Sequence, residues 1–372
     1  MQYRREIDGL RALAVLPVVL FHAGIELFSG GYLGVDVFFV ISGYLITGIL
    51  IKDYQAQQFS LVKFYDRRAR RILPALSLVM ICTLPAAWFW LMPDQFESYA
   101  WSLVAVVLFV SNILFWRETN YFADAVEEKP LLHTWSLAVE EQFYIVFPIL
   151  LMLMWRLDQR HIRFWLAGIL VASLIWAEHL SKTAESAAFY LLPARAWELM
   201  AGALVAQQEF RKGVATGGRS RIYAALGLLL IIVSIFGFSE GTRHPSIYTV
   251  VPVLGTVLLI RYGRDPGWAH KLLILKPVVG VGLISYSLYL WHQPLFAFAR
   301  VRTLHEPSVL LMLVLAAVAV LLAWVSWAYI EAPFRNREEG HFTRRRIFGY
   351  SAFVGFCFAC IGVAGVMGNG FT

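Results

Sequence analysis

The sequence predicts an all-α, polytopic integral membrane protein, and three observations lead to that fold class. Hydrophobic residues make up 59% of the 372 residues and charged residues only 15%, whereas an average soluble domain has about 25% charged residues. Apolar runs recur along the whole chain at the length needed to cross a bilayer core, roughly 17–25 residues. Lysine and arginine residues gather in the loops between these runs. The net charge of +7 is therefore typical of loops that determine membrane topology and contact lipid head groups, and it does not indicate nucleic-acid binding.

Twelve apolar runs are the candidate spans. They lie near residues 9–27, 34–51, 72–92, 99–116, 135–155, 162–180, 191–208, 222–238, 246–261, 277–298, 307–331 and 347–367. Lysine and arginine clusters follow the second, fifth, seventh, ninth and eleventh runs. The positive-inside rule places these loops in the cytoplasm together with the N-terminus.

This topology is self-consistent if one run between residues 72 and 155 does not cross the bilayer. We expect run 99–116 to stay on the outer side or to re-enter, with the acidic stretch Glu118–Glu128 beyond it. About eleven transmembrane helices then remain, with the N-terminus cytoplasmic and the C-terminus periplasmic. The alternative is that run 99–116 is an ordinary span and a different run does not cross.

The first apolar run carries ionisable side chains. Arg11 and His22 are eleven residues apart, which on a helix is three turns, or about 16 Å along the axis, with both side chains on one face. Glu26 follows His22 at i+4, where a carboxylate orients an imidazole and raises its basicity. An ionisable residue inside a membrane span is costly to bury and indicates a functional site.

Polar residues interrupt other runs as well. They are Asp36 and Ser42 in the second run, the loop cluster Arg67, Arg68, Arg70 and Arg71, then His133, Glu140 and Glu141 at the mouth of the fifth run, and Glu198, His292 and Glu331 in later runs. Each has a plainer explanation: border arginines determine topology and bind lipid phosphate, and buried histidines form hydrogen bonds between helices. The sequence leaves open which of Glu140 and Glu141 faces the interior.

Two kinds of protein would need this set of residues. A neutral imidazole removes the proton of a hydroxyl that attacks a thioester, and a guanidinium binds phosphate oxygens with two hydrogen bonds. A coenzyme A ester fits that spacing, with its charged head in the cytoplasmic leaflet and its reactive end within the membrane. A proton-coupled transporter also needs buried His and Glu residues and is the alternative. The three cysteines lie in apolar runs and predict no zinc site, and we expect no metal.

Seven motifs in order resemble the acyltransferase-3 family of bacterial membrane O-acyltransferases. They are Asp8-Gly9-Leu10-Arg11 with Arg11-x10-His22, Gly34-Val35-Asp36-Val37-Phe38-Phe39-Val40-Ile41-Ser42-Gly43-Tyr44, Arg68-x-Arg70-Arg71-Ile72-x-Pro74, His133-Thr134-Trp135-Ser136-Leu137-x3-Glu141-x-Phe143-Tyr144, Ser285-Tyr286-Ser287-Leu288-Tyr289-Leu290-Trp291-His292-x-Pro294 and Glu331-x-Pro333-Phe334-Arg335. The resemblance runs from about residue 4 to residue 337.

The resemblance implies a ten-helix unit that takes acetyl-CoA as its cytoplasmic donor and acetylates an extracytoplasmic carbohydrate. It implies His22 as the catalytic histidine, and Arg11, Arg68, Arg70 and Arg71 as donor-side residues. We add Glu26 and Asp36 as catalytic candidates, Ser42 as a donor-side candidate, and His133, Glu141, His292 and Glu331 as further polar candidates. The expected acceptor is a lipid-linked or surface glycan, first lipopolysaccharide O-antigen, then peptidoglycan or exported polysaccharide.

The expected domain organisation follows from the same comparison. Residues 1–337 form the acyltransferase unit, and residues 338–372 form a cytoplasmic loop and one additional transmembrane helix. Many family members continue from such a helix into an outer SGNH-type domain, which we expect in the native protein and which this chain lacks. The expected location is the bacterial inner membrane, with the acyl-CoA donor, the glycan acceptor and membrane lipids as partners.

Overall fold

The computed structural model describes residues 3–119, 123–213, 215, 217–303, 305–335 and 343–371, and every regular element among them is a helix. The all-α prediction is therefore confirmed for this part of the chain. The chain divides into two compact units: residues 1–59 with 139–285, and residues 60–138 with 286–372.

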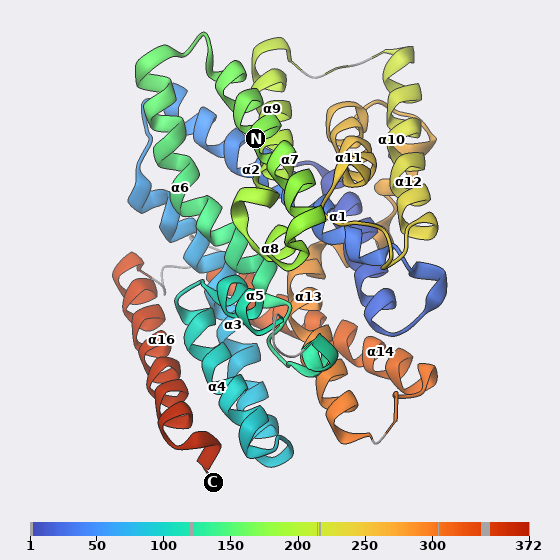
Figure 1. Ribbon diagram of the computed structural model, residues 1–372. Coiled ribbons are helices and arrows are strands. Elements are labelled where there is room, and N and C mark those ends of the chain that lie inside the picture. The colour runs from blue at the N-terminus through green and yellow to red at the C-terminus, as the bar shows by residue number, and fades with distance from the viewer. Residues whose placement is uncertain are drawn as a thin grey trace. The chain divides into compact units, whose positions relative to one another are not determined.

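Unit 1 contains the N-terminal helices and the middle of the chain (Figure 1). Its helices are α1 (Arg5–His22), α2 (Gly34–Gln55), most of α6 (Thr134–Asp158), α7 (Ile162–Thr183), α8 (Glu185–Tyr190), α9 (Leu192–Lys212), α10 (Gly218–Gly237), α11 (Val250–Tyr262), α12 (Trp268–Leu273) and the start of α13 (Lys276–Arg302). Short 3₁₀ turns are η1 (Glu26–Phe28), η2 (Gly31–Leu33) and η4 (Ile247–Thr249).

Close approach of backbones holds the centre of unit 1 together. A Cβ at Gly43 of α2 would lie 1.9 Å from the carbonyl oxygen of Leu199 in α9, and one at Gly202 of α9 would lie 2.0 Å from the carbonyl oxygen of Val40. Small residues such as these glycines let the backbones of two membrane helices touch. A contiguous apolar core that includes Tyr44 and Trp197 forms around the pair.

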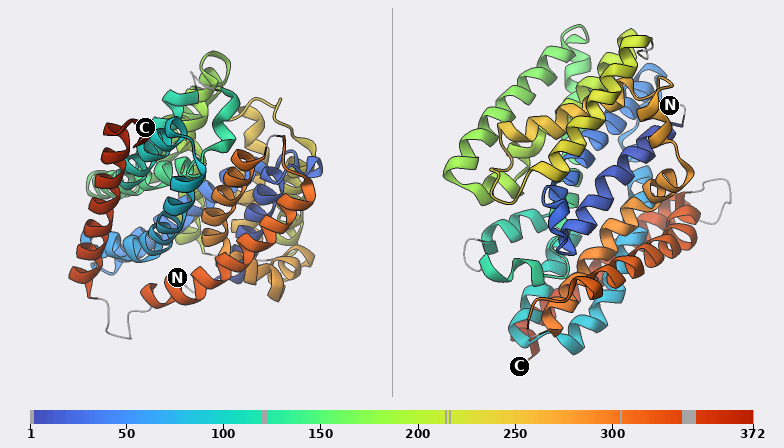
Figure 2. Two further views of the ribbon diagram at one scale, coloured as in Figure 1. Left: turned by 90° about the horizontal axis from the view of Figure 1, so that it is seen from below. Right: turned by 90° about the vertical axis from the view of Figure 1, so that its right-hand side faces the viewer.

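Unit 2 contains α3 (Leu61–Trp90), α4 (Pro93–Val107), α5 (Ser111–Thr119), the 3₁₀ segment η3 (Ala123–Glu128), the rest of α13, α14 (Val309–Ser326), the π-helical turn η5 (Trp327–Glu331), α15 (Ala332–Arg335), α16 (Arg344–Met367) and η6 (Asn369–Phe371). Helix α16 runs beside α4 (Figure 1 and the left view of Figure 2). Gly362 of α16 permits this, because a Cβ there would lie 2.7 Å from the carbonyl oxygen of Ala100.

Seven described helices are long and apolar enough to cross a membrane, and Ile247–Tyr262 is a shorter apolar helix. The seven correspond to the expected runs in α2, α3, α6, α7, α10, α14 and α16. The expected runs in α1, α9 and α13 are helical but are not among the seven. Helices α1 and α9 carry buried charged residues, among them Glu6, Asp8, Arg195 and Glu198, which lower their mean hydropathy.

The run 99–116 is broken rather than continuous. Helix α4 ends at Val107, Phe109 has a positive φ of 54°, and α5 begins at Ser111. A bulky residue at positive φ interrupts a helix, so this run does not cross as one helix. Its re-entrant path stays a prediction. Part of the acidic stretch beyond it, and the predicted domain boundary at residues 337 and 338, lie outside the described residues.

The structure corrects the placement of the arginine cluster. We expected residues 67–71 in a loop, but they lie within the first three turns of α3. Ser60 accepts a hydrogen bond from the backbone N–H of Lys63 and caps the helix. Arginine is also a good helix former, so the apolar span and its basic border form one helix.

Candidate functional site

His22 is the last residue of α1. Its Nδ1 lies 2.9 Å from the carbonyl oxygen of Val18, one turn earlier. Since a carbonyl only accepts hydrogen bonds, we assign the ring hydrogen to Nδ1, which leaves the lone pair of a neutral imidazole on Nε2. The imidazole is therefore held by its own helix with its basic nitrogen on the opposite side of the ring.

The prediction that Glu26 lies one helical turn beyond His22 is wrong. Helix α1 ends at His22, Gly24 follows with φ of +76°, and Glu26 begins the separate turn η1 with an exposed side chain. Only a continuous helix would put i and i+4 on one face. The catalytic role assigned to Glu26 loses its geometric reason and stays a prediction.

Arg11 lies on the same helix as His22, as expected, because α1 is continuous from Arg5 to His22. Its Nη1 is 3.5 Å from Oδ1 of Asp8, and the two side chains are only 12% and 11% exposed. A Cβ at Gly282 would lie 1.8 Å from the backbone oxygen of Asp8, so this end of α1 packs tightly against α13 within unit 1. The guanidinium is thus paired and largely shielded.

A chain of ring contacts leads from His22 to the start of α2. The His22 ring lies 5.1 Å from that of Phe21, which lies 5.6 Å from Tyr32, and Tyr32 lies 5.0 Å from His244. Gly31 allows this arrangement, since a Cβ there would lie 2.2 Å from the carbonyl oxygen of Pro17. The turn η2 therefore packs directly against the last turns of α1.

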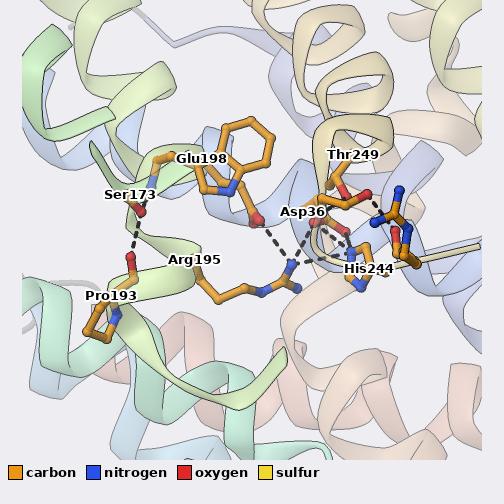
Figure 3. Close-up of polar contacts among 10 residues, drawn as sticks. Asp36, Ser173, Pro193, Arg195, Glu198, His244 and Thr249 are labelled. Atoms are coloured by element: carbon orange, nitrogen blue, oxygen red, sulfur yellow. Dashed lines mark hydrogen bonds and ion pairs between the residues drawn. The ribbon is translucent and has the colours of Figure 1, made fainter. Parts of the chain in front are cut away.

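Beyond these rings lies a buried ionic cluster, which we define as Asp36, Arg195, Glu198 and His244 (Figure 3). Arg195 Nη1 is 3.0 Å from Oδ1 of Asp36 and 2.9 Å from Oε1 of Glu198. His244 Nε2 is 3.0 Å from both oxygens of Asp36 and 3.3 Å from Arg195 Nη1. The carboxylates accept from the guanidinium, and we assign the imidazole hydrogen to Nε2 because it faces two carboxylate oxygens.

Three separate segments bring the cluster together. Asp36 lies in the first turn of α2, Arg195 and Glu198 are at i and i+3 near the start of α9, and His244 lies in the loop before η4. Burial of His244 lowers the pKa of its imidazole, because an apolar environment disfavours the charged form. Asp36 and Glu198 were candidates from the sequence, whereas Arg195 and His244 were missed.

Ser42 contacts a carboxylate rather than standing alone. Its hydroxyl donates to Oε1 of Glu140 over 2.9 Å, and the Tyr144 hydroxyl donates to Oε2 over 2.8 Å. The structure thus assigns Glu140 to this contact in unit 1. Glu141 is half-buried on the next position of α6.

The arginines of α3 belong to unit 2. Arg68 and Arg70 are buried, and Arg70 Nε is 2.9 Å from Oδ1 of Asp66. The Arg68 guanidinium lies over the Phe64 ring at 6.0 Å, and Arg71 is half-buried. Lipid-facing topological arginines would be more exposed than this pair.

Unit 2 brings together two predicted histidines. The rings of His133 and His292 are 5.9 Å apart, and both contact the ring of Tyr289. Glu331 lies in the π-helical turn η5 and accepts a hydrogen bond from the Ser287 hydroxyl. Such turns within α-helices are frequent at functional sites.

A cavity of about 530 Å³ opens in unit 1 at the Arg4 end of α1, the end opposite His22. Arg4 donates to the Tyr44 hydroxyl, to Glu209 and to the carbonyl oxygen of Ile260. Lys52 and Arg264 also line it. Arg4 is not among the residues predicted from the sequence.

Comparison with known proteins identifies relatives over most of the chain. An acyltransferase-domain family matches residues 4–328. The peptidoglycan O-acetyltransferase OatA of Listeria monocytogenes is 29% identical over 90% of this chain and 56% of its own length. The O-acetyltransferase OatA of Staphylococcus aureus is 29% identical over 90% of this chain and 58% of its own length.

A third relative matches over nearly its whole length. The putative membrane-bound transacylase BcsY of Komagataeibacter xylinus is 31% identical over 98% of this chain and 90% of its own length. The chain thus spans little more than half of the OatA proteins and most of BcsY. No solved structure matches the chain.

Proposed function

Because this chain belongs to the acyltransferase-3 family, we propose that it is a membrane O-acetyltransferase that moves an acetyl group from cytoplasmic acetyl-CoA to a hydroxyl of an extracytoplasmic carbohydrate. The family match over residues 4–328 is the observation that carries the proposal. The relative named a peptidoglycan O-acetyltransferase favours peptidoglycan as the acceptor, ahead of the O-antigen that we first expected.

His22 is the proposed catalytic base. Its Nδ1 hydrogen bond to Val18 supports a neutral imidazole whose Nε2 takes the proton of the acceptor hydroxyl. The oxygen then attacks the thioester carbonyl, the carbon–sulfur bond breaks, and the coenzyme A thiolate leaves. The same nitrogen is also suited to carry the acetyl group as a covalent adduct before the acceptor attacks.

Arg11 is the proposed contact for the phosphates of the donor. Three helical turns separate it from His22, about 16 Å along the axis, which matches a donor whose charged head and reactive thioester lie far apart. Lys52 lines a cavity at the same end of α1 and adds positive charge there, whereas Arg264 in its lining pairs with Glu6 and Glu209. We propose donor-side roles for Arg68, Arg70, Arg71 and Ser42 from the family motif alone.

The proposed topology retains eleven transmembrane helices, a cytoplasmic N-terminus and a periplasmic C-terminus in the bacterial inner membrane. The seven long apolar helices provide part of this number. Helices α1, α9, α11 and α13 provide the rest, because partner helices instead of lipid surround their polar residues. An SGNH-type domain beyond the last helix completes the proposed native protein.

The decisive experiment compares surface glycans by mass spectrometry in cells with the intact gene, without it, and with His22→Ala. We expect O-acetyl groups on peptidoglycan or another surface glycan only with the intact gene. His161→Ala, an exposed histidine on unit 1, is the matched control and should keep acetylation. Full acetylation with correctly inserted His22→Ala would overturn the catalytic assignment.

A second experiment separates the enzyme from the alternative, a proton-coupled transporter with buried His and Glu. Purified protein should bind radiolabelled acetyl-CoA, and Arg11→Ala should weaken that binding while the exposed-arginine control Arg163→Ala does not. Proton-driven uptake of a solute into vesicles, without acetyl-CoA binding, would favour the transporter.

A further inference from the structure

The buried ionic cluster of unit 1 has an imbalance of charge. Asp36, Arg195 and Glu198 have side chains that are 0% exposed. Two carboxylates and one guanidinium sum to one negative charge. No other lysine or arginine among the described residues forms an ion pair with either carboxyl group. An uncompensated charge without access to water is strongly disfavoured, and such a group takes up a proton instead.

His244 does not supply the missing positive charge. Burial lowers the pKa of its imidazole, so the ring is neutral at neutral pH. Its Nε2–H donates to Asp36, and its Nδ1 has no hydrogen-bond partner in the described part of the chain. Outside the cluster, the exposed carboxylate of Glu185 also acts on this ring, and it is negative. The charge must therefore be balanced by a proton on a carboxyl group.

The geometry indicates where that proton is. The carboxyl groups of Asp36 and Glu198 are neighbours, because Arg195 Nη1 lies 3.0 Å from Oδ1 of Asp36 and 2.9 Å from Oε1 of Glu198. One proton on either carboxyl group balances the single positive charge that the two share. Asp36 already accepts from Arg195 and His244, whereas no donor among the described residues reaches Oε2 of Glu198. Glu198 is the side chain with a vacant position for the hydrogen.

We propose that this cluster is a buried proton-binding site, which holds one proton on the Glu198–Asp36 carboxyl pair and exchanges it during acetyl transfer. The exchange step rests on the proposed function. In that reaction the hydroxyl proton is released where the carbon–oxygen ester bond forms, and the thiolate left by the broken carbon–sulfur bond takes up one proton. With the acceptor outside and the donor inside, each acetyl group moved outward requires one proton to be gained on the inner side.

Within unit 1 the cluster lies near the His22 end of α1. It is connected to His22 through the packed rings of Phe21 and Tyr32. These contacts couple the position of the imidazole to the cluster, because a change in the cluster's charge acts on His244, which packs on Tyr32. Asp36 and Glu198 are therefore positioning residues that act on His22 through this contact.

Infrared spectroscopy of the purified full chain tests the site without reference to catalysis. At neutral pH the wild type should show the carbonyl stretch of a protonated carboxyl group, shifted in D₂O. Both Glu198→Gln and Asp36→Asn should lose it, because one remaining carboxylate balances Arg195. Glu185→Gln, an exposed carboxylate next to the cluster, should keep it. A wild-type spectrum without this band, or a band that survives both substitutions, would overturn the proton-binding site.

Difference spectra test the exchange. Mixing wild type with acetyl-CoA and solubilised peptidoglycan fragments should change the protonated-carboxyl band, and Glu198→Gln should show no change at that frequency. An unchanged wild-type band while acetylated fragments accumulate would overturn the exchange but leave the static site. A static band without any acetylation of fragments, surface glycans or coenzyme A turnover would instead contradict the proposed function.

Discussion

At the scale of the residue, Arg195 determines whether the buried cluster of unit 1 is tolerated. Its guanidinium contacts both carboxyl groups within 3.0 Å and is fully buried. Replacing one partner of a buried ion pair leaves an uncompensated charge, whereas replacing all partners by neutral groups removes the penalty. Arg195 therefore stabilises the fold only because the carboxyl groups of Asp36 and Glu198 surround it.

We expect Arg195→Leu to lower the free energy of unfolding by about 3–5 kcal/mol. The triple variant Arg195→Leu, Asp36→Asn and Glu198→Gln should recover most of that loss. Thermal unfolding in detergent, followed by tryptophan fluorescence, measures both. Arg163→Leu on the exposed face of α7 is the control and should change little. Equal instability of the single and triple variants would contradict the charge argument.

His244 makes stability depend on pH. Its pKa is lowered in the folded protein by burial, so the unfolded chain binds more protons as the pH falls below the ordinary value of about 6.5. Stability contributed by the neutral imidazole is present above that pH and is lost as the pH falls toward the folded pKa.

We therefore expect the melting temperature of the wild type to fall more between pH 7.5 and pH 5.5 than that of His244→Gln. Glutamine keeps an amide donor toward Asp36 and cannot titrate. Parallel pH dependence in the two proteins would show that another group is responsible.

At the scale of the element, the contact between α2 and α9 is the clearest case in which two helices need each other. Both helices carry cluster residues, and their glycines let the backbones touch. This pairing, rather than helix propensity, positions Asp36 opposite Arg195.

Gly43→Ala should destabilise the protein by about 1–3 kcal/mol or more, because the new Cβ would meet a backbone oxygen at 1.9 Å. Gly168→Ala in α7 meets nothing within 4 Å and should stabilise by up to about 1 kcal/mol through helix propensity alone. Denaturation with SDS, followed by far-UV circular dichroism, compares the two. Destabilisation of both variants to the same extent would contradict the packing argument.

Helix α3 shows what the local sequence pattern predicts correctly about an element and what it does not. The apolar run and the basic cluster were both evident, but their separation into span and loop was wrong. Residues 67–71 contain neither glycine nor proline, so nothing ends the helix between them and the run that follows.

At the scale of the whole molecule, topology is the property that the proposed reaction needs. Donor and acceptor lie on opposite sides only if the loops alternate as the positive-inside rule predicts. The short loop after α6, which contains Arg160, and the loop after α13 lie on opposite sides in that scheme.

With the three native cysteines replaced by alanine, Arg160→Cys should react with a membrane-impermeant maleimide only in inside-out vesicles. Glu306→Cys should react in intact spheroplasts. Both positions are exposed. Labelling of both positions from the same side would contradict the eleven-span topology.

The sequence alone determined the class of the molecule and its family, because hydropathy, loop charge and motif order are local and survive without any knowledge of packing. It also identified His22, Arg11 and Asp36 as candidates, since an ionisable residue within an apolar run can be recognised without knowing the fold. The end of α1 at His22, and hence the loss of the Glu26 contact, is a local effect of Gly24, whose positive φ stops the helix and was overlooked in the sequence. The partnership of Arg195 and His244 with Asp36 depended on three segments distant in sequence. Only the tertiary structure decided it, because the charge balance of a buried group is set by its neighbours in space.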